Sequence, residues 1–521
     1  MEDRSLMAAE QGANSPASAP GGAPSPARPA SQARGEGDLA FATVGELSRL
    51  IQRGAISPVE LTRLFLARLE RLGPQFNAVA AVMPERALAE ARRAEAALRR
   101  GASRGALHGI PYGAKDLLAA RGAPTTWGAP PYRHQVLDDD ATVVRRLSRA
   151  GAVLAAKLAM VELAGGGGYR YASASLQGPG RTPWDPACWS GGSSSGSGAA
   201  VAAGLVPFAI GSETSGSIIT PASYCGVTGL RPTYGLVSRA GAMALSWTLD
   251  KLGPMARSAE DCALVLEAMA GPDPRDPSSA RRRFRYRPLA LPELQQLRLG
   301  VAPADFEELA DQRARPAFAA ALEVLRSLGA AFVEVGLPPD LPYGAVVATI
   351  IGAEASTIFA GLIESDAFQT LVDAKQKAGL RADLGIAARD YLNAMRIRAR
   401  VQQAFRDLFR QVDVLVGVGR PGPATPIDQP LDRRASRRPA PPPARPANPA
   451  LIPAGNLAGL PALCLPCGFA RASGARKEGA SELPVAIQLV GPPFAENRLL
   501  SLGAWFQAQT DWHRRRPPGC S

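Results

Sequence analysis

Two amphipathic helices are predicted close to the start of the ordered chain, each with its own N-terminal cap. Thr43 and Glu46 have the spacing of a capping box, and apolar residues recur at helical spacing over 47–51. The segment 57–60 (Ser-Pro-Val-Glu) combines an N-cap serine, a first-turn proline and a capping glutamate ahead of an apolar stripe over 61–69. The ordered part of the chain is therefore expected to begin with two helices.

Beyond these helices, short apolar runs alternate with helical patterns. The predicted strands are 152–155, 297–301, 332–335 and 412–416. The predicted helices are 198–203, a helix capped by Ser258 and Asp261 that runs through Leu266, one that ends near Leu328, and a long one over 387–409. This alternation indicates an α/β fold with a largely buried mixed or parallel sheet.

Two stretches fall outside this pattern. Residues 1–38 are rich in Pro, Ala, Gly and Ser and have almost no large apolar side chains, so they are predicted to be disordered. Residues 420–449 are so rich in proline that we expect an irregular surface loop, one that could flank a site. The predicted organisation is a disordered tract over 1–38, a single folded domain over 39–516 that carries this loop, and a short tail over 517–521.

The charge pattern narrows the classes of partner. The chain of 521 residues has a formal charge of +13, but its arginine clusters (281–285, 433–445 and 514–516) read as separate loops and a tail. We therefore expect no nucleic-acid partner. Only six of the 59 basic residues are lysines, a bias typical of GC-rich bacterial genomes. Each lysine deserves scrutiny because a desolvated lysine can lose its proton near neutral pH, whereas arginine cannot.

Cysteine usage and apolar runs set the expected compartment. Cys464 and Cys467 have CxxC spacing, but no second Cys or His pair completes a zinc site, so we expect packing residues, no metal and no cofactor. The longest apolar run, 199–210, is too short to span a membrane, and the N-terminus lacks the pattern of a signal peptide. A cytoplasmic protein without a membrane span is expected.

Two serine-glycine clusters and one lysine are the strongest chemical signal. The clusters are 190–197 (Ser-Gly-Gly-Ser-Ser-Ser-Gly-Ser) and 211–217 (Gly-Ser-Glu-Thr-Ser-Gly-Ser), and Lys115 lies in the segment 109–116. Flexible linkers would explain the clusters, but both sit within apolar sequence, which favours tight turns whose N–H groups could hold an oxyanion. The chain has only three histidines, so lysine is the more plausible base for an activated serine.

These segments resemble the signature motifs of the amidase signature family. The likeness continues through Pro221-Ala222, 225–235, 237–239 and the late segment 456–462, and it covers the chain from about Leu39 to its C-terminus. The resemblance implies an α/β amidase-signature fold in which helices cover both faces of a large mixed sheet. Several separated motifs in the same order make chance agreement very unlikely.

The resemblance also implies a role for individual residues. Ser217 would be the nucleophile, Ser193 a bridging serine that follows a cis peptide bond, and Lys115 a neutral base. Ser194 would be a supporting residue. The backbone N–H groups of Thr214, Ser215, Gly216 and Ser217 would form the oxyanion hole.

Three residues depart from the family pattern. Ser195 and Ser215 stand where glycines are usual, and Ile219 stands where the family usually has an arginine. Ser215 adds a Cβ beside the expected oxyanion hole and disfavours a positive φ there. None of the three changes touches the catalytic residues, so they bear on the substrate and leave the chemistry intact.

Three functions remain open on the sequence alone. The first is a stand-alone hydrolase that cleaves a carboxylic amide through an acyl-enzyme on Ser217, with aryl esters or carbamates (urethanes) as further substrates. The second is the glutaminase subunit of a tRNA-dependent amidotransferase, and the third is a catalytically silent binding protein. The expected partners are a small-molecule amide and water, with a homodimer considered; the lack of an arginine in the second cluster suggests an uncharged, aryl substrate.

Overall fold

The computed structural model describes residues 35–432, 445–472 and 481–520. Most of the tract 1–38, part of the loop 420–449, and Ser521 lie outside these residues. The first described helix is α1 (Glu36–Ala40).

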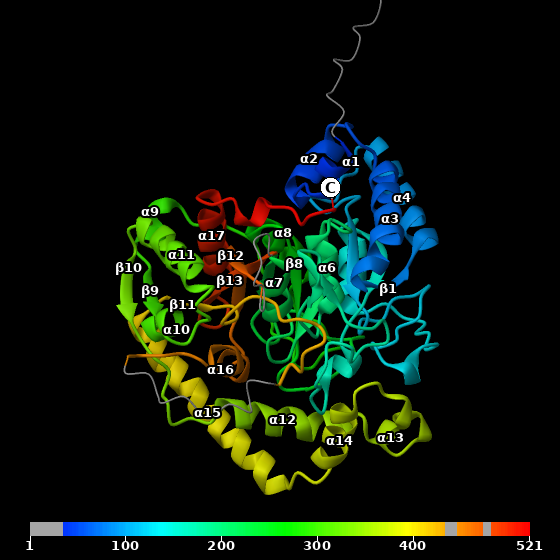
Figure 1. The fold of residues 1–521 in the computed structure, drawn as a ribbon. Coiled ribbons are helices and arrows are strands. Elements are labelled where there is room, and N and C mark those ends of the chain that lie inside the picture. The colour runs from blue at the N-terminus through cyan, green and yellow to red at the C-terminus, as the bar shows by residue number, and fades with distance from the viewer. Residues whose placement is uncertain (1–34, 433–444, 473–480, 521) are drawn as a thin grey trace, which may run out of the picture. The chain divides into compact units, whose positions relative to one another are not determined.

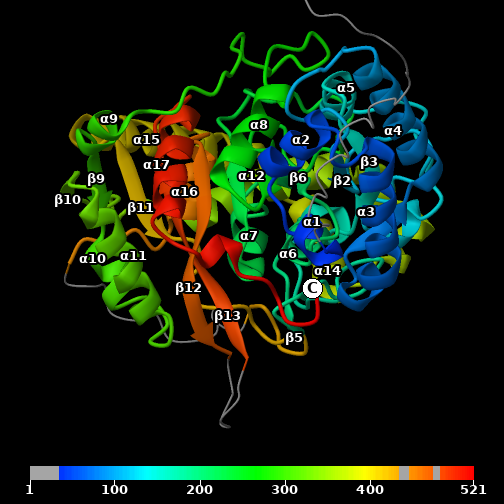
Figure 2. The same ribbon diagram turned by 90° about the horizontal axis from the view of Figure 1, so that it is seen from above.

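A mixed sheet of 11 strands forms the centre of the fold (Figures 1 and 2). In spatial order the strands are β1 (Val79–Val82), β3 (Val153–Leu158), β2 (Pro111–Lys115), β6 (Phe208–Glu213), β8 (Lys251–Ala256), β7 (Thr228–Arg231), β12 (Ala462–Arg471), β13 (Glu482–Val490), β11 (Val414–Val418), β9 (Arg298–Val301) and β10 (Ala331–Glu334). Strand β2 pairs in parallel with both β3 and β6, while β8 pairs antiparallel with β6 and β7. A separate hairpin joins β4 (Arg181–Thr182) and β5 (Asp185–Trp189). The predicted large mixed sheet is confirmed.

Helices cover both faces of this sheet, as predicted. Successive side chains of a strand point to opposite faces, and in β6 Phe208 and Ile210 belong to one hydrophobic core whereas Ala209 belongs to the other. The first core includes side chains of α2 (Val44–Gln52), α5 (Thr142–Arg149), α8 (Ala259–Met269), α11 (Arg315–Ser327) and α17 (Glu496–Ala508). The second includes side chains of α4 (Pro84–Arg99), α6 (Ser195–Ala202), α7 (Ile219–Cys225), α15 (Ala388–Gln411) and α16 (Leu451–Leu457).

The predicted helix starts and strands are confirmed to within a few residues. Thr43 and Ser57 close capping boxes at the N-termini of α2 and α3 (Pro58–Leu72). Ser258 accepts a hydrogen bond from Asp261 N at the start of α8 (3.0 Å). The remaining helices are α9 (Leu291–Gln295), α10 (Pro303–Glu307), α12 (Tyr343–Ile358), α13 (Ala360–Ile363) and α14 (Ala374–Asp383). Capping hydroxyl and carboxylate side chains thus locate helix N-termini that helix propensity alone would not define.

A group of helices from the middle of the chain lies along one side of the sheet. Figure 1 shows α12, α14 and α15 together there, with the long α15 packed beside α12. Glu354 of α12 accepts hydrogen bonds from Thr248 Oγ1 (2.9 Å), Tyr391 Oη (2.8 Å) and Ser246 Oγ. This buried carboxylate therefore ties α12 and α15 to the loop that precedes β8.

The two CxxC cysteines lie within β12. Cys464 and Cys467 are fully buried, and each is a free thiol. Within residues 35–432, 445–472 and 481–520, no cluster of three or more His, Cys, Asp or Glu side chains could hold a metal ion. In the same residues, no helix combines the length and apolar character needed to cross a membrane.

Candidate active site

Lys115 and the two serine clusters meet because of the order of the strands. Lys115 ends β2, and the 211–217 cluster begins at the end of β6, which pairs in parallel with β2. Parallel strands that lie side by side deliver their carboxyl ends to the same edge of a sheet. The 190–197 cluster lies at this edge of the sheet too, where it forms the turn before α6 and the first residues of that helix.

The Lys115 amine is buried and bonded to two serines. Its Nζ lies 2.7 Å from Ser193 Oγ and 2.8 Å from Ser212 Oγ, and the side chain has no solvent exposure. Burial lowers the pKa of Lys115 to about 7, although the carboxylates of Asp250 and Glu213 act to raise it. A large fraction of this lysine is therefore neutral near physiological pH, and a neutral amine can accept a proton.

The first cluster is joined to the second through Ser194. Its Oγ donates to Ser212 O (3.1 Å) and accepts from Ser212 N (3.2 Å), and its N–H donates to Ser217 O (3.3 Å). The peptide bond between Gly192 and Ser193 is cis, as the resemblance implies. Ser193 and Ser217 share no hydrogen bond in the described part of the chain, so the structure brings Lys115 to Ser193 and places Ser217 on the adjoining turn.

The turn over 214–217 offers free backbone donors. Among the described residues, no acceptor pairs with the N–H groups of Ser215, Gly216 and Ser217. Gly216 takes a φ of +95°, and Ser217 is half-buried, whereas the Ser193 side chain is buried. Unpaired amides beside a half-exposed serine are the arrangement that an oxyanion requires.

The Glu213 carboxylate stabilises this turn. It accepts from Ile218 N (2.8 Å) and Ile219 N (2.9 Å) at the start of α7, and from Arg231 Nη1 and Asn456 Nδ2 (both 2.8 Å). Burial alone would raise the pKa of Glu213, but Arg231 and the other donors hold it at about 2. The carboxylate is thus charged at any working pH and fixes the peptide on the far side of Ser217.

Asp250 holds the other side of the turn. It accepts from Thr214 Oγ1 (2.6 Å) and from the N–H groups of Leu245 and Ser246 (2.8 and 2.9 Å). Burial raises the pKa of Asp250, opposed by these hydrogen bonds. The Thr214 side chain is therefore engaged in support of the turn and is not available to a substrate.

Ser217 faces a cavity of about 310 Å³. Its walls include Tyr169, Trp189, Leu245, Ile351, Arg420 and Asp432. A Cβ at Gly192 would lie 2.9 Å from the Trp189 ring and 3.1 Å from Tyr169 Oη, so only glycine lets these aromatics close the wall beside Ser193. The volume suits a small molecule.

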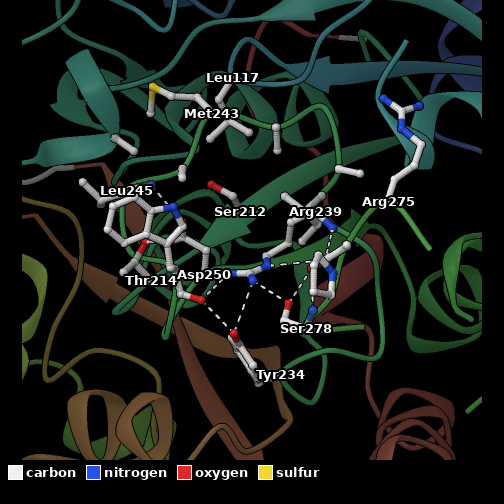
Figure 3. Close-up of a pocket in the computed structure, with 18 residues that line it drawn as sticks. Leu117, Ser212, Thr214, Tyr234, Arg239, Met243, Leu245, Asp250, Arg275 and Ser278 are labelled. Atoms are coloured by element: carbon white, nitrogen blue, oxygen red, sulfur yellow. Dashed lines mark hydrogen bonds and ion pairs between the residues drawn. The ribbon is translucent and has the colours of Figure 1, made fainter. Parts of the chain in front are cut away.

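A second cavity, of about 380 Å³, lies on the Ser212 side of the turn (Figure 3). It shares Ala164, Thr214 and Leu245 with the first. Figure 3 shows the Arg239 guanidinium engaged by Tyr234 Oη (3.2 Å) and Ser278 Oγ (2.5 Å), while Arg275 lies apart. The Arg239 side chain thus organises the rim of this cavity.

The three departures from the family pattern have local structural accounts. Ser215 is not among the residues with positive φ, so its Cβ adds no backbone strain. Within the 214–217 turn, Gly216 is the residue that takes a positive φ. Ser195 is the first residue of α6, with its Oγ 3.4 Å from Ala159 O. Ile219 is fully buried in the second core and is not among the residues that line the Ser217 cavity.

Comparison with known proteins identifies the family. The sequence profile of the amidase family matches residues 60–500. The chain belongs to the amidase signature family. It is 38% identical to a glutamyl-tRNA(Gln) amidotransferase subunit from Methylococcus capsulatus, over 92% of this chain and 99% of that protein. This amidase-family chain is accordingly an enzyme of an amide-hydrolysing group.

Solved structures of amidases share the fold. Peptide amidase from Stenotrophomonas maltophilia is 30% identical, with a TM-score of 0.77 over 93% of this chain and all of that one. A chain from a vestigial protein complex, described in connection with the origins of an s-triazine catabolic enzyme, is 32% identical, with a TM-score of 0.78 over 90% of this amidase and 98% of that chain. The amidase-signature fold predicted from the motifs is thereby confirmed.

Three site residues were missed by sequence reasoning. Ser212, the second acceptor for Lys115, precedes Glu213 in the cluster and could have been found from its place at the end of a strand. Asp250 and Arg420 were not named, although Arg420 is the first residue of the loop 420–449, which was expected to flank a site. Only the fold brings them to the site.

Glu213→Gln is expected to destabilise this amidase because an amide cannot replace the charge and all four acceptor contacts of the carboxylate. Loss of one partner of a buried ion pair typically costs about 3 kcal/mol or more in the free energy of unfolding. Urea denaturation measures the free energy of unfolding of the variant and of the wild type. The matched control is Glu323→Gln, in an exposed pair with Arg326, where we expect less than about 0.5 kcal/mol. Equal, small losses in both variants would contradict the bracing role.

Proposed function

We propose that this amidase cleaves a carboxylic amide C–N bond through a Ser217–Ser193–Lys115 relay and an acyl-enzyme on Ser217. The observation that carries the proposal is the 2.7 Å contact between Lys115 Nζ and Ser193 Oγ, two side chains that are both buried. A lysine with a lowered pKa beside a hydroxyl is a typical activated-nucleophile arrangement. The 214–217 turn adds the donors that such a reaction needs.

The steps follow from these contacts. Neutral Lys115 accepts the Ser193 hydroxyl proton while Ser193 Oγ takes the proton of Ser217, whose oxygen attacks the amide carbonyl. The tetrahedral oxyanion is held by the free N–H groups of the 214–217 turn. Return of the proton through Ser193 to the leaving nitrogen breaks the C–N bond and leaves the acyl group on Ser217. Water then attacks the acyl-enzyme, losing its proton to the same relay, and releases the carboxylic acid.

The comparisons support a glutaminase subunit better than a stand-alone amidase. The Methylococcus capsulatus relative shares 38% identity with nearly full coverage and carries the name of an amidotransferase subunit. We propose that the amide is the side chain of glutamine and that the ammonia released passes to an acceptor held by partner subunits. The same chemistry would serve for small-molecule amides of similar shape.

A stand-alone amidase is the second candidate, and two observations favour it. Ile219 stands, buried, where the family usually carries an arginine, so the neighbourhood of Ser217 differs from the common pattern. Solved structures named as amidases also share the fold at 30–31% identity. Aryl esters and carbamates would be cleaved by the same acyl-enzyme route.

Ser217→Ala and Lys115→Ala should each abolish amide hydrolysis, with losses on the order of a thousandfold or more in kcat. Ammonia release from glutamine, benzamide and a short peptide amide, together with p-nitrophenyl acetate hydrolysis, measures the effect. Ser195→Ala is the matched control, because this serine lies in the same region but its Oγ makes only a 3.4 Å contact with a carbonyl. Full activity in Ser217→Ala would disprove the relay.

Partner dependence separates the two candidates. As a glutaminase subunit, the chain should hydrolyse glutamine faster when co-expressed with the amidotransferase subunits of the same genome, and the complex should amidate glutamyl-tRNA. As a stand-alone amidase, it should hydrolyse benzamide or a peptide amide at a higher kcat/KM than glutamine, with no response to those subunits. The second outcome would overturn our first assignment.

A further inference from the structure

A single basic side chain faces the Ser217 cavity. Among the described residues that line this cavity, Arg420 is the only lysine or arginine. It follows β11 by two residues, where the chain leaves the sheet, and it also borders a neighbouring cavity of about 410 Å³ that shares Ser215. A residue outside both signature clusters therefore places a positive charge beside the nucleophile.

The Arg420 guanidinium has no counter-charge within the described residues. Its Nε is buried and without a hydrogen-bond partner there, and no described carboxylate forms an ion pair with it. It lines the Ser217 cavity together with Tyr169, where burial raises the pKa of the Tyr169 hydroxyl and the charge of Arg420 opposes that rise. A partly buried cation without a partner is unfavourable. An anionic group of a ligand that paired with Arg420 would therefore be stabilised there.

The acidic side chains nearby are already occupied. Asp432 lines the same cavity, but Lys375 (3.1 Å) and Arg170 (3.7 Å) engage it from outside. Asp305 lines the neighbouring cavity and accepts from Asn448 N (2.7 Å), and burial raises its pKa to about 6. Neither forms an ion pair with Arg420 within the described residues, so Arg420 is the unpaired charged side chain of the Ser217 cavity.

We propose that Arg420 is a specificity-determining residue that binds a carboxylate of the substrate. A planar guanidinium binds carboxylates in a bidentate manner, which gives both affinity and orientation. The inference rests on the proposed amide hydrolysis in this cavity, and it replaces the expectation of an uncharged aryl substrate. The substrate class is a small amide with a free carboxylate a few bonds from the scissile carbonyl, and glutamine belongs to this class.

The test compares two probes: glutaramate, the monoamide of glutaric acid, and its methyl ester, which lacks the negative charge and carries one additional methyl group. Ammonia release gives kcat/KM for the wild type, Arg420→Gln and Arg420→Lys. Truncation of a buried charge partner costs about 30-fold or more, so Arg420→Gln should lower kcat/KM for glutaramate by about that factor, mainly through KM. The methyl ester should change little, and Arg420→Lys should restore part of the preference.

The matched control is Arg389→Gln, which removes an exposed arginine that lines neither the Ser217 cavity nor its neighbour and forms no ion pair with a residue of either in the described part of the chain. It should retain the wild-type preference for glutaramate over the ester. Circular dichroism and urea unfolding of each variant report whether the fold is retained.

A binding measurement separates failure of this inference from failure of the proposed function. Calorimetry on Ser217→Ala, with and without Arg420→Gln, reports carboxylate binding without any reaction. We expect glutaramate to bind Ser217→Ala more tightly than the methyl ester, and Arg420→Gln to remove that difference. Equal binding of the two probes, or a preference that survives Arg420→Gln, would overturn the inference. Hydrolysis that survives Ser217→Ala would instead count against the proposed function.

Discussion

The burial of one lysine amine is the constraint on which the rest of the site depends. Lys115 sits at the end of a buried strand with no exposure to water, and desolvation disfavours its charged form. The two serine hydroxyls beside it satisfy the amine without supplying the full negative charge that would keep it protonated. A carboxylate in direct contact would hold the amine in its charged form, as an ion pair that cannot accept a proton. Hydroxyl partners allow the amine to be neutral and so to act as a base.

A contrast within the same sheet supports this view. Lys157, on the adjacent strand β3, is also buried but pairs directly with Asp116 Oδ1 at 2.7 Å. Burial lowers the pKa of Lys157 too, but the Asp116 carboxylate opposes this by favouring the charged ammonium, which suits a structural role. The described part of the chain buries three lysines: Lys157 pairs with a carboxylate, Lys251 donates to the Leu249 carbonyl, and Lys115 contacts two serine hydroxyls.

Much of the fold and part of the site could be predicted from the sequence. Capping boxes at Thr43 and Ser57 and the apolar runs of the strands are local signals, and the motifs around Lys115 and Ser217 are specific. The predicted serines and lysine do lie at one edge of the sheet. By contrast, the partners of Glu213 are Arg231 and Asn456, which are 18 and 243 residues away along the chain. Contacts over such separations are created by strand order, which periodicity does not reveal.

In the proposed mechanism, recognition and chemistry come from different parts of this amidase. The signature clusters would supply the nucleophile, the relay and the oxyanion donors, whereas Arg420 and Ile351 line the cavity from just beyond β11 and from α12. Loops and helices outside a rigid scaffold can change without disturbing the catalytic group. The loss of a cation at Ile219 and the presence of one at Arg420 fit this division.

The most direct test of the central claim is the pH dependence of Ser217 sulfonylation by phenylmethylsulfonyl fluoride, followed by intact mass spectrometry. Only neutral Lys115 can accept the proton, so the rate should rise about tenfold per pH unit below pH 7 and level off above it, with an apparent pKa of about 7. Lys115→Ala should remove this rise, and Lys377→Ala, at a half-buried lysine that lines neither the Ser217 cavity nor the cavity beside Ser212, should preserve it. A rate that keeps rising to pH 10, or one unaffected by Lys115→Ala, would contradict the account.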